Sequence, residues 1–432
     1  MTPQSQFTVV APIAKDREPE LRRLLATMNS VPGVADPNNA LVPFGEFGNL
    51  HYARFALLND PTQGDIEAYG VRRAGLPSYL AFLGDFDGSS RECLAQIVQR
   101  AGAGLREIFR HCADFEADRD LLSWMLAHDL PVAANYVNWV GRTVVQIKEE
   151  CALQRVLAAR VDRSPVASAA AARQRRGELV AFARDEVAAH RLSLTPPAPT
   201  PLGWQLAKLQ NLTAGVLLTL IASPVLLLLS PLLLIALRQA ESRDAEICPR
   251  PDAALLHELQ NMEDLDVSNQ YTALGSAKPG AFRGALMTVV LAAIQFACRH
   301  VFTCGFLARV QSIHFARWVF VDGKQRVIFV SNYDGGHQAY MDDFINKAAF
   351  GLNVVFSNGV GWPHTEWLII QGARREHYFK YFQRRHQLPT QVWYKAYPGL
   401  TLIDITRNAR IRQGLEMAQP SDAEVLAWLK LL

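Results

Sequence analysis

A six-residue pattern occurs twice in this chain, and this repeat limits the fold more than any other feature. "LHYARF" stands at residues 50–55 and "IHFARW" at residues 313–318. Further pairs follow in the same order, with separations that change only slowly, as loops of different length would make them. They are QFTVVAPIAK (6–15) with QYTALGSAK (270–278), FDG (86–88) with YDG (333–335), AGLREIF (103–109) with FGLNVVF (350–356), HDLP (128–131) with HQLP (386–389), and GRT (141–143) with GLT (399–401). We infer a tandem duplication that covers roughly residues 6–158 and 270–416.

The elements expected within the first copy indicate a particular module. Apolar patterning predicts strands over residues 7–13, 51–58 and 79–86, and helices from residue 19 and over residues 91–110. Strand, helix, strand, strand, helix is the beginning of a ferredoxin-like βαββαβ unit. We therefore expect an α+β fold in which two ferredoxin-like modules form a pseudo-twofold barrel or sandwich, with helices outside.

The segment between the two copies, residues 159–268, has no counterpart in either of them. It begins with an Ala- and Arg-rich stretch over residues 167–191, for which we expect a helix, and continues through a Pro-rich linker at residues 195–201. The apolar run over residues 212–237 follows, without a single charge. We expect a helical insertion that associates with a membrane through this run, and a separate C-terminal helix over residues 417–432.

The apolar run is long enough to cross a bilayer, yet the duplication argues against one crossing. About 20 apolar residues span the hydrocarbon core, but modules that pack together must lie on one side. Pro224 and Pro231 each favour a bend, which suits a shallow hairpin. The second copy's first helix, residues 285–298, is also apolar all round. We predict a monotopic protein; the alternative is a buried helix hairpin in a soluble oligomer.

Composition and the cysteines bear on compartment and partners. The formal charge of +3 is nearly balanced, so a nucleic-acid partner is not indicated. The six cysteines are scattered without metal-binding spacing, and the first residues do not resemble a secretory signal. We expect reduced thiols and attachment at the cytoplasmic face of the membrane, with membrane lipid and an apolar small molecule as partners. The sequence leaves a homo-oligomer open.

The polar residues that recur in both copies are the candidates for chemistry. His51, Arg54 and Asp87 reappear as His314, Arg317 and Asp334. Residues three apart on a strand face opposite sides, so the histidine and arginine of one copy need a bulge to share a cavity. Repetition can equally preserve a fold: each aspartate suits a turn before a helix, and each histidine suits a hydrogen-bonded core position.

The string "GDFDG" at residues 84–88 resembles the GxxDG motif of dye-decolourising peroxidases, haem proteins of the dimeric α+β barrel superfamily that are built from two ferredoxin-like modules. This resemblance implies a haem, with Asp87 as the distal acid that assists peroxide cleavage and Asp334 as its second-copy equivalent. It also implies a distal arginine, either Arg54 or Arg317. The resemblance also implies that a histidine of the second module binds the iron; the motif does not assign it, and His314 and His364 are the candidates.

Two functions are therefore consistent with the sequence. The first is a membrane-surface oxidoreductase, peroxidase-like, acting on an apolar or lipid-derived substrate. The alternative is a non-catalytic lipid-binding or scaffold protein at the membrane. No zinc spacing, GxSxG nucleophile elbow, Walker loop or dinucleotide fingerprint points to another chemistry.

Overall fold

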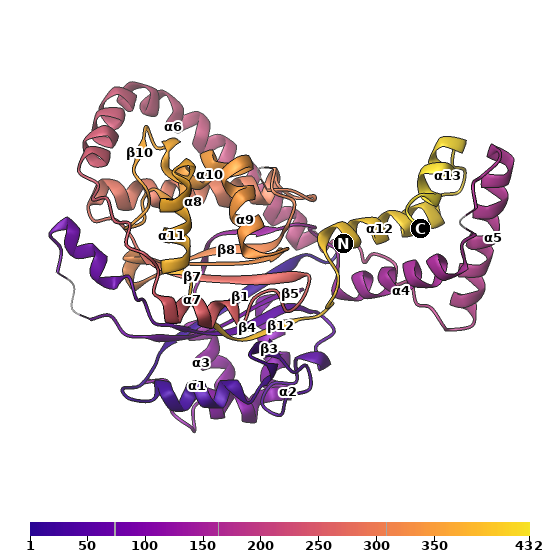
Figure 1. The fold of residues 1–432 in the computed structure, drawn as a ribbon, viewed down its shortest axis with the longest axis horizontal. Coiled ribbons are helices and arrows are strands. Elements are labelled where there is room, and N and C mark those ends of the chain that lie inside the picture. Colours follow the sequence, from indigo (N-terminus) through magenta and orange to yellow (C-terminus); the bar gives the residue numbers. More distant parts are fainter. Residues whose placement is uncertain (73–74, 163, 308) are drawn as a thin grey trace.

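The computed structural model describes residues 1–72, 75–162, 164–307 and 309–432, and its fold is mixed α+β. Two sheets are stacked face to face, with helices on both outer sides and a separate group of helices at one end (Figure 1). We call residues 4–160 the first half and residues 268–416 the second half. The expected α+β class is correct.

The first sheet has the strand order β1-β5-β4-β12-β3-β2. β4 is buried along its whole length, as its run of apolar and aromatic residues predicts. The helices on its outer face present buried leucines inward, and the Ser89 hydroxyl caps α2 by accepting the N–H of Glu92. The elements are β1 (Gln4–Pro12), α1 (Glu18–Ala26), β2 (Asn29–Val31), β3 (Gly33–Ala35), β4 (Leu50–Leu58), β5 (Tyr79–Asp87), α2 (Ser90–Phe109), α3 (Leu121–His128) and β12 (Thr390–Lys395).

The second sheet has the order β6-β8-β9-β7 and is covered by α8 to α11 (Figure 1). A two-stranded hairpin, β10-β11, lies beside these helices. The elements are β6 (Val132–Val137), β7 (Ser268–Ser276), α8 (Ala281–His300), β8 (Ile313–Val321), β9 (Arg326–Asp334), α9 (His337–Asp343), α10 (Ala349–Phe356), β10 (Thr365–Glu366), β11 (Ile370–Gln371) and α11 (Glu376–His386). Single 3-10 turns occupy Phe44–Glu46, Gln63–Tyr69, Asp322–Lys324 and Gly372–Arg374, and a π turn occupies Phe344–Ala348.

The two halves exchange their last strands. β6 belongs to the first half but pairs with β8, and β12 belongs to the second half but pairs with β4. Just before its exchanged strand, each half makes a hydrogen bond to its own first strand. The N–H of Leu130 donates to the carbonyl of Thr8 at 2.9 Å, and the N–H of Leu388 donates to the carbonyl of Thr272 at 2.8 Å. The sheets are therefore joined at two places, between β1 and the residues before β6 and between β7 and the residues before β12. The sequence indicates the order of the elements but not this exchange.

Apolar side chains from both sheets fill the space between them. This inner core contains small and branched residues from β1, β4, β5, β7, β8 and β9, and it is closed to solvent. Its members are Val10, Ala56, Leu58, Ala81, Leu83, Leu274, Val319, Val321, Ile328, Val330 and Leu388. The outer cores, between each sheet and its helices, are larger and rich in aromatic residues.

Four helices project from the end of the stacked sheets (Figure 1). α4 (Val144–Arg160) packs on α12 (Leu402–Glu416), and α5 (Ala169–Ala188) packs on α13 (Asp422–Leu429). Their shared core includes Leu157, Ile411 and Trp428. The Ala- and Arg-rich stretch is thus helical, and it lies with the C-terminal helix rather than with the apolar run.

The apolar run belongs to one continuous helix, α6 (Leu202–Ser242), which is followed by α7 (Ala253–Gln260). Figure 1 shows α6 curving into an arch over the helices of the second half. The expected helix hairpin over residues 212–237 is therefore wrong in detail, because the chain bends without leaving the helix. Its prolines lie within the helix, at Pro224 and Pro231.

Candidate functional site

The two repeated arginines lie between the sheets and make matching contacts. Arg54 on β4 donates to the carbonyl of Tyr271 and the hydroxyl of Thr272, both at 2.9 Å, and to the carbonyl of Ser331 and the side chain of Asn332. Burial lowers the pKa of Arg54 to about 9, although the nearby Asp85 carboxylate opposes this shift. Arg54 thus ties β4 of the first sheet to β7 and β9 of the second.

Arg317 on β8 makes the same contacts in the opposite direction. It donates to the carbonyl of Phe7 at 2.7 Å, to the hydroxyl of Thr8 at 3.2 Å, to the carbonyl of Gly84 at 3.1 Å and to the carboxylate of Asp85. The terminal nitrogens of both arginines therefore donate to acceptors of the opposite sheet. They are cross-braces between the sheets.

The histidines and aspartates form two pairs at the end of the barrel. His51 Nε2 lies 3.0 Å from Asp87 Oδ1, and His314 Nε2 lies 2.7 Å from Asp334 Oδ1. Each strand has a register irregularity at its histidine. The regular alternation that would place the histidine and the arginine of one half on opposite faces is therefore interrupted at this point. Burial opposes ionisation of Asp334, but His314 and several hydrogen bonds outweigh it and hold the pKa of this carboxyl below its usual value.

Each aspartate also holds the start of a distant helix. Asp87 Oδ2 accepts the N–H of Val144 at 2.9 Å, and Asp334 Oδ2 accepts that of Leu402 at 2.7 Å. These residues begin α4 and α12, so the aspartates stabilise the projecting helices through the positive N-terminal ends of their dipoles. Asp87 also ends β5 directly before the turn at Gly88, as its expected place before a helix requires, and the cap of α2 is Ser89.

These residues do not form a site that fits a haem. His51 and His314 line a common cavity of about 20 Å³, whereas sites for larger ligands enclose roughly 300 Å³ or more. His314 Nε2 is engaged by Asp334, and His364 Nε2 donates to the backbone carbonyl of Glu241 at 2.9 Å. Among the residues that the structure describes, no group of three or more His, Cys, Asp or Glu side chains could hold a metal ion. The peroxidase-like activity stays a prediction from the resemblance.

A different feature, a hollow in the second half, distinguishes the two halves. A cavity of about 60 Å³ lies between the outer face of the second sheet and helices α8, α10 and α11. Three of its wall positions on and after β7 are small: Ala273, Gly275 and Ala277. Four aromatic side chains also border the space: Trp318, Phe329, Phe356 and Phe382. The hollow therefore offers a dry, apolar surface.

The corresponding positions of the first half carry larger side chains. In the pairing of the two copies, Val9, Ala11 and Ile13 stand where the second half has Ala273, Gly275 and Ala277. Val9 and Ala11 are completely buried in the outer core of the first half, and Ile13 packs against it. The hollow thus arises from the loss of side-chain volume along one strand.

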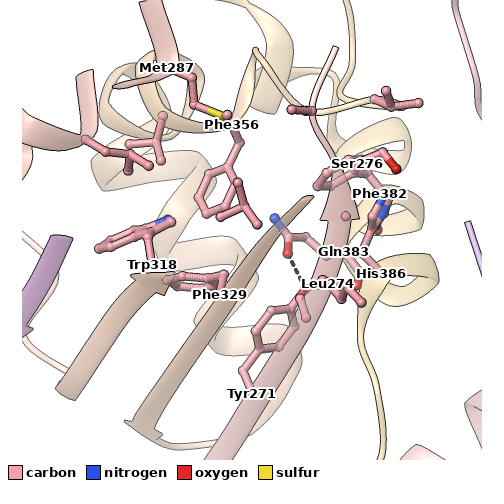
Figure 2. A pocket seen from close by; sticks show the side chains of 18 residues that line it. Tyr271, Leu274, Ser276, Met287, Trp318, Phe329, Phe356, Phe382, Gln383 and His386 are labelled. Carbon is pink, nitrogen blue, oxygen red and sulfur yellow. Dashed lines mark hydrogen bonds between the residues drawn. The ribbon is translucent and has the colours of Figure 1, made fainter. Parts of the chain in front are cut away.

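Polar side chains lie at one end of the hollow, at positions where the first half has apolar side chains. The hydroxyl of Tyr271 donates to Gln383 Oε1 at 2.5 Å, and Figure 2 shows the Gln383 amide reaching between Phe356 and Tyr271. The first half has Phe7 and Met125 at these positions. The Ser276 hydroxyl, also in the wall, is buried and has no hydrogen-bond partner among the described residues. The hollow is apolar with a few polar groups, as small-molecule sites commonly are.

The arch of α6 bends because of a repeated Ser-Pro pair. Pro224 and Pro231 cannot donate to the carbonyls of Leu220 and Leu227, one turn earlier. The hydroxyls of the preceding serines donate to these same carbonyls instead, at 3.1 Å and 2.7 Å. The prolines are seven residues apart, close to two helical turns, so both bends point the same way. Every carbonyl freed by a proline keeps a partner, which a lipid environment demands.

Both ends of the arch, which we call the first foot (residues 204–211) and the second foot (residues 238–242), lie near α8. Near the first foot, the side chain of Asn211 lies 3.0 Å from His300 Nε2, at the end of α8. Beyond the second foot, Asp244 accepts hydrogen bonds from Arg283 at 2.6 Å and Lys278 at 2.7 Å, at the start of α8. Burial lowers the pKa of Lys278 to about 8, with Asp244 opposing the shift. The arch therefore leaves the body and returns to it along one helix.

The apolar side chains of the arch are exposed. Leu228, near the middle, is 80% exposed, and Ile221 is 73% exposed. Within the described residues, α6 and α8 are long and apolar enough to cross a membrane by length and composition. An uncovered apolar surface of this size is typical of contact with lipid or protein.

The sequence analysis located the apolar run of the arch but missed the hollow and the side chains that line it. The signal was the difference between the two copies, Val9 against Ala273 and Met125 against Gln383, rather than their shared residues. Comparison with protein-family models, curated proteins and solved structures found no match to this chain.

Proposed function

We propose that this chain is a monotopic membrane protein that binds the apolar part of a lipid-derived small molecule in the hollow of its second half. The observation that carries the proposal is that α8 serves both features: Met287 and Leu291 form part of the cavity wall, and the same helix supports the arch. A ligand drawn from the bilayer would thus meet the body next to its site.

The arrangement of the arch supports attachment without crossing. Between Asn211 and Asp244 a straight helix would extend about 50 Å, whereas the stretch of α8 from Arg283 to His300 covers about 25 Å. The helix must therefore rise and return. With both feet on one body, the apolar run enters a single leaflet, and the barrel lies on one side, which we take to be the cytoplasmic face.

The size and polarity of the hollow favour a particular ligand chemistry. A cavity of about 150 Å³ can bind benzene, so a space of about 60 Å³ suits a short stretch of hydrocarbon chain. The Gln383 amide would meet a carbonyl or hydroxyl oxygen on that chain. We propose an acyl or isoprenoid chain with one polar group as the ligand.

We also infer that the halves come from one duplicated ferredoxin-like unit whose fourth strand is exchanged. The matching strand orders β1-β5-β4 and β7-β9-β8 support this origin, as do the matching contacts of Arg54 and Arg317. In that case the hollow is a later specialisation of one copy.

The test is lipid binding by a variant with a filled hollow. Ala273→Val together with Ala277→Ile introduces the first half's side chains at two of the three positions. We expect the wild-type protein, purified in mild detergent, to bind a fluorescent polyene fatty acid. The filled variant should bind the fatty acid on the order of tenfold more weakly, because one or two methylene groups of the ligand can then no longer be buried in the hollow. Val9→Ala, the reverse change in the first half, is the control and should bind as wild type. Equal binding by the filled variant would refute the proposed site.

A further inference from the structure

The hairpin β10-β11 has an unusual backbone at its tip. Trp367 and Leu368 have φ angles of 54° and 68°, a left-handed conformation that costs side chains other than glycine about 1 kcal/mol or more. Such strain persists only where surrounding contacts hold it. The tip is also apolar and open: Trp367 is 45% exposed and Ile370 is 42% exposed.

The contact that holds the tip comes from the second foot of the arch. Glu241 on α6 is fully buried, and its carboxylate accepts the N–H groups of Trp367 at 2.9 Å and Leu368 at 2.7 Å. It also accepts the Thr365 hydroxyl at 3.1 Å and pairs with Arg238 at 2.6 Å. One carboxylate thus fixes two consecutive strained residues to the end of the apolar helix.

The base of the hairpin is held from the opposite side. The side-chain nitrogen of Asn353, on α10, donates to the carbonyls of Ile369 at 2.9 Å and Gln371 at 3.0 Å, and its oxygen accepts the N–H of Ala373. Gly372 is required there, because a Cβ would lie 2.1 Å from the Asn353 oxygen. The hairpin is therefore a rigid element whose apolar tip is kept outward.

A tryptophan and a cation pair at both feet of the arch. The Arg238 guanidinium lies 5.1 Å from the Trp367 ring, and the Lys208 ammonium lies 5.5 Å from the Trp204 ring at the first foot. The sequence between Lys208 and Arg238 carries no charge. Tryptophans gather at the membrane interface, and long cationic side chains extend from apolar segments to the headgroups.

We propose that the tip of the hairpin, residues 367–370, is a second membrane-contacting element that lies at the boundary between phospholipid headgroups and acyl chains. The two tryptophan-cation pairs set the depth at which the protein lies, and Glu241 couples the tip to the arch. This inference rests on the proposed membrane attachment through α6. It adds a contact outside α6 and a residue that controls it.

The test places an environment-sensitive fluorophore on single cysteines of the full chain. Cys248 and Cys304, the less buried cysteines, are replaced by serine, and the label is attached at Ile369→Cys, Leu228→Cys or Gln99→Cys. With phosphatidylcholine vesicles we expect a blue shift and protection from an aqueous quencher at 369 and 228. The label at 99, on the outer helix of the first half, should not change.

The outcomes separate the two proposals. A buried label at 228 with an unchanged label at 369 would overturn the role of the hairpin and leave the attachment through α6 intact. An unchanged label at 228 would remove the attachment and this inference with it.

A substitution in the clamp provides a second measurement. Glu241→Gln loses an acceptor for one of the two backbone N–H groups, so the label at 369 should lose its protection while the label at 228 keeps it. Glu246→Gln is the matched control, because Glu246 pairs with Arg375 outside the hairpin, and it should alter neither label. Retained protection at 369 in Glu241→Gln would show that Glu241 does not control the tip.

Discussion

Between the two sheets the two halves make nearly the same contacts, and on the outer faces of the sheets they differ. Arg54 and Arg317 make the same four kinds of contact across the sheets. On the outer faces, α1 carries charged side chains toward solvent, whereas its counterpart α8 is apolar and supports the arch. What the halves share maintains the fold. We look for function in the features outside this shared interior: the hollow and the hairpin of the second half, and the arch of α6 in the segment between the halves.

The largest effect should follow from charging the arch. Leu218→Lys, Ile221→Lys and Leu228→Lys together should abolish vesicle association in flotation experiments, since each charge costs about 2.5–3.5 kcal/mol in a membrane segment. The same three positions changed to alanine form the control and should stay bound. High salt should not release the wild type, because apolar burial is not screened by ions. Release of wild type by salt would contradict lipid insertion.

Removing a cross-brace tests whether the interior is symmetric. Arg317→Ala should lower the free energy of unfolding by about 3–5 kcal/mol, because it leaves the buried Asp85 without its cation. Arg54→Ala should cost less, since its side-chain acceptor is the neutral Asn332. Denaturant unfolding of both variants in one detergent measures the difference. Losses below about 1 kcal/mol for Arg317→Ala would mean that the brace is dispensable.

Acid should weaken the second half through His337. Burial lowers the pKa of this histidine to about 3, with Arg384 and Lys380 adding to the shift, and neither ring nitrogen has a hydrogen-bond partner among the described residues. The unfolded chain therefore binds a proton near pH 6.5 that the folded chain refuses. Stability should fall as pH drops below 6.5, by up to about 3 kcal/mol at pH 4.

His337→Leu isolates that contribution. Burial also lowers the pKa values of His111 and His386, so the wild type will lose stability in acid for several reasons. The difference between wild type and His337→Leu should widen as pH falls from 6.5 to 4 and be constant above pH 7.5. Parallel curves throughout the range would rule out a titration at His337.

The smallest effects should come from the aspartates. Asp87→Ala and Asp334→Ala each remove the acceptor at the start of a projecting helix, which costs about 1–2 kcal/mol, and each also removes the partner of a buried histidine. The two losses should be similar, because the two contacts match at 2.9 Å and 2.7 Å. Thermal unfolding provides the comparison. A much larger loss of a peroxide-dependent activity than of stability at Asp87 would instead revive the peroxidase-like hypothesis.

The repeated pattern was informative about the fold and misleading about the site. It placed Arg54 and Arg317 on equivalent strands, and apolar periodicity placed β4, β5 and α2 within a residue or two. Yet repetition drew attention to His314 and Asp334, whose contacts maintain the structure. The residues that recur in the pattern, such as Arg54 and Arg317, make contacts that hold the fold together.

The remaining features depend on contacts that no local pattern contains. β6 and β12 are ordinary short strands in sequence, and which sheet they join is decided by the closing of the whole barrel. The strained backbone at Trp367 is held in place because the carboxylate of Glu241, more than a hundred residues earlier in the chain, accepts its N–H. The smaller side chain of Ala273 compared with Val9 could have indicated the hollow from the sequence. Its shape, however, also depends on α10 and α11, which are distant from β7 in the sequence.

The exchange of the last strands has a consequence for the order of events during synthesis. β12 pairs Thr390 with Ala56, so the first sheet stays incomplete until almost the entire chain has left the ribosome. Contacts between such distant segments form slowly, because a long loop must first close. The apolar helix emerges well before that moment. We therefore expect nascent chains to reach the bilayer while the barrel is still open, and the final closing step to occur on the membrane.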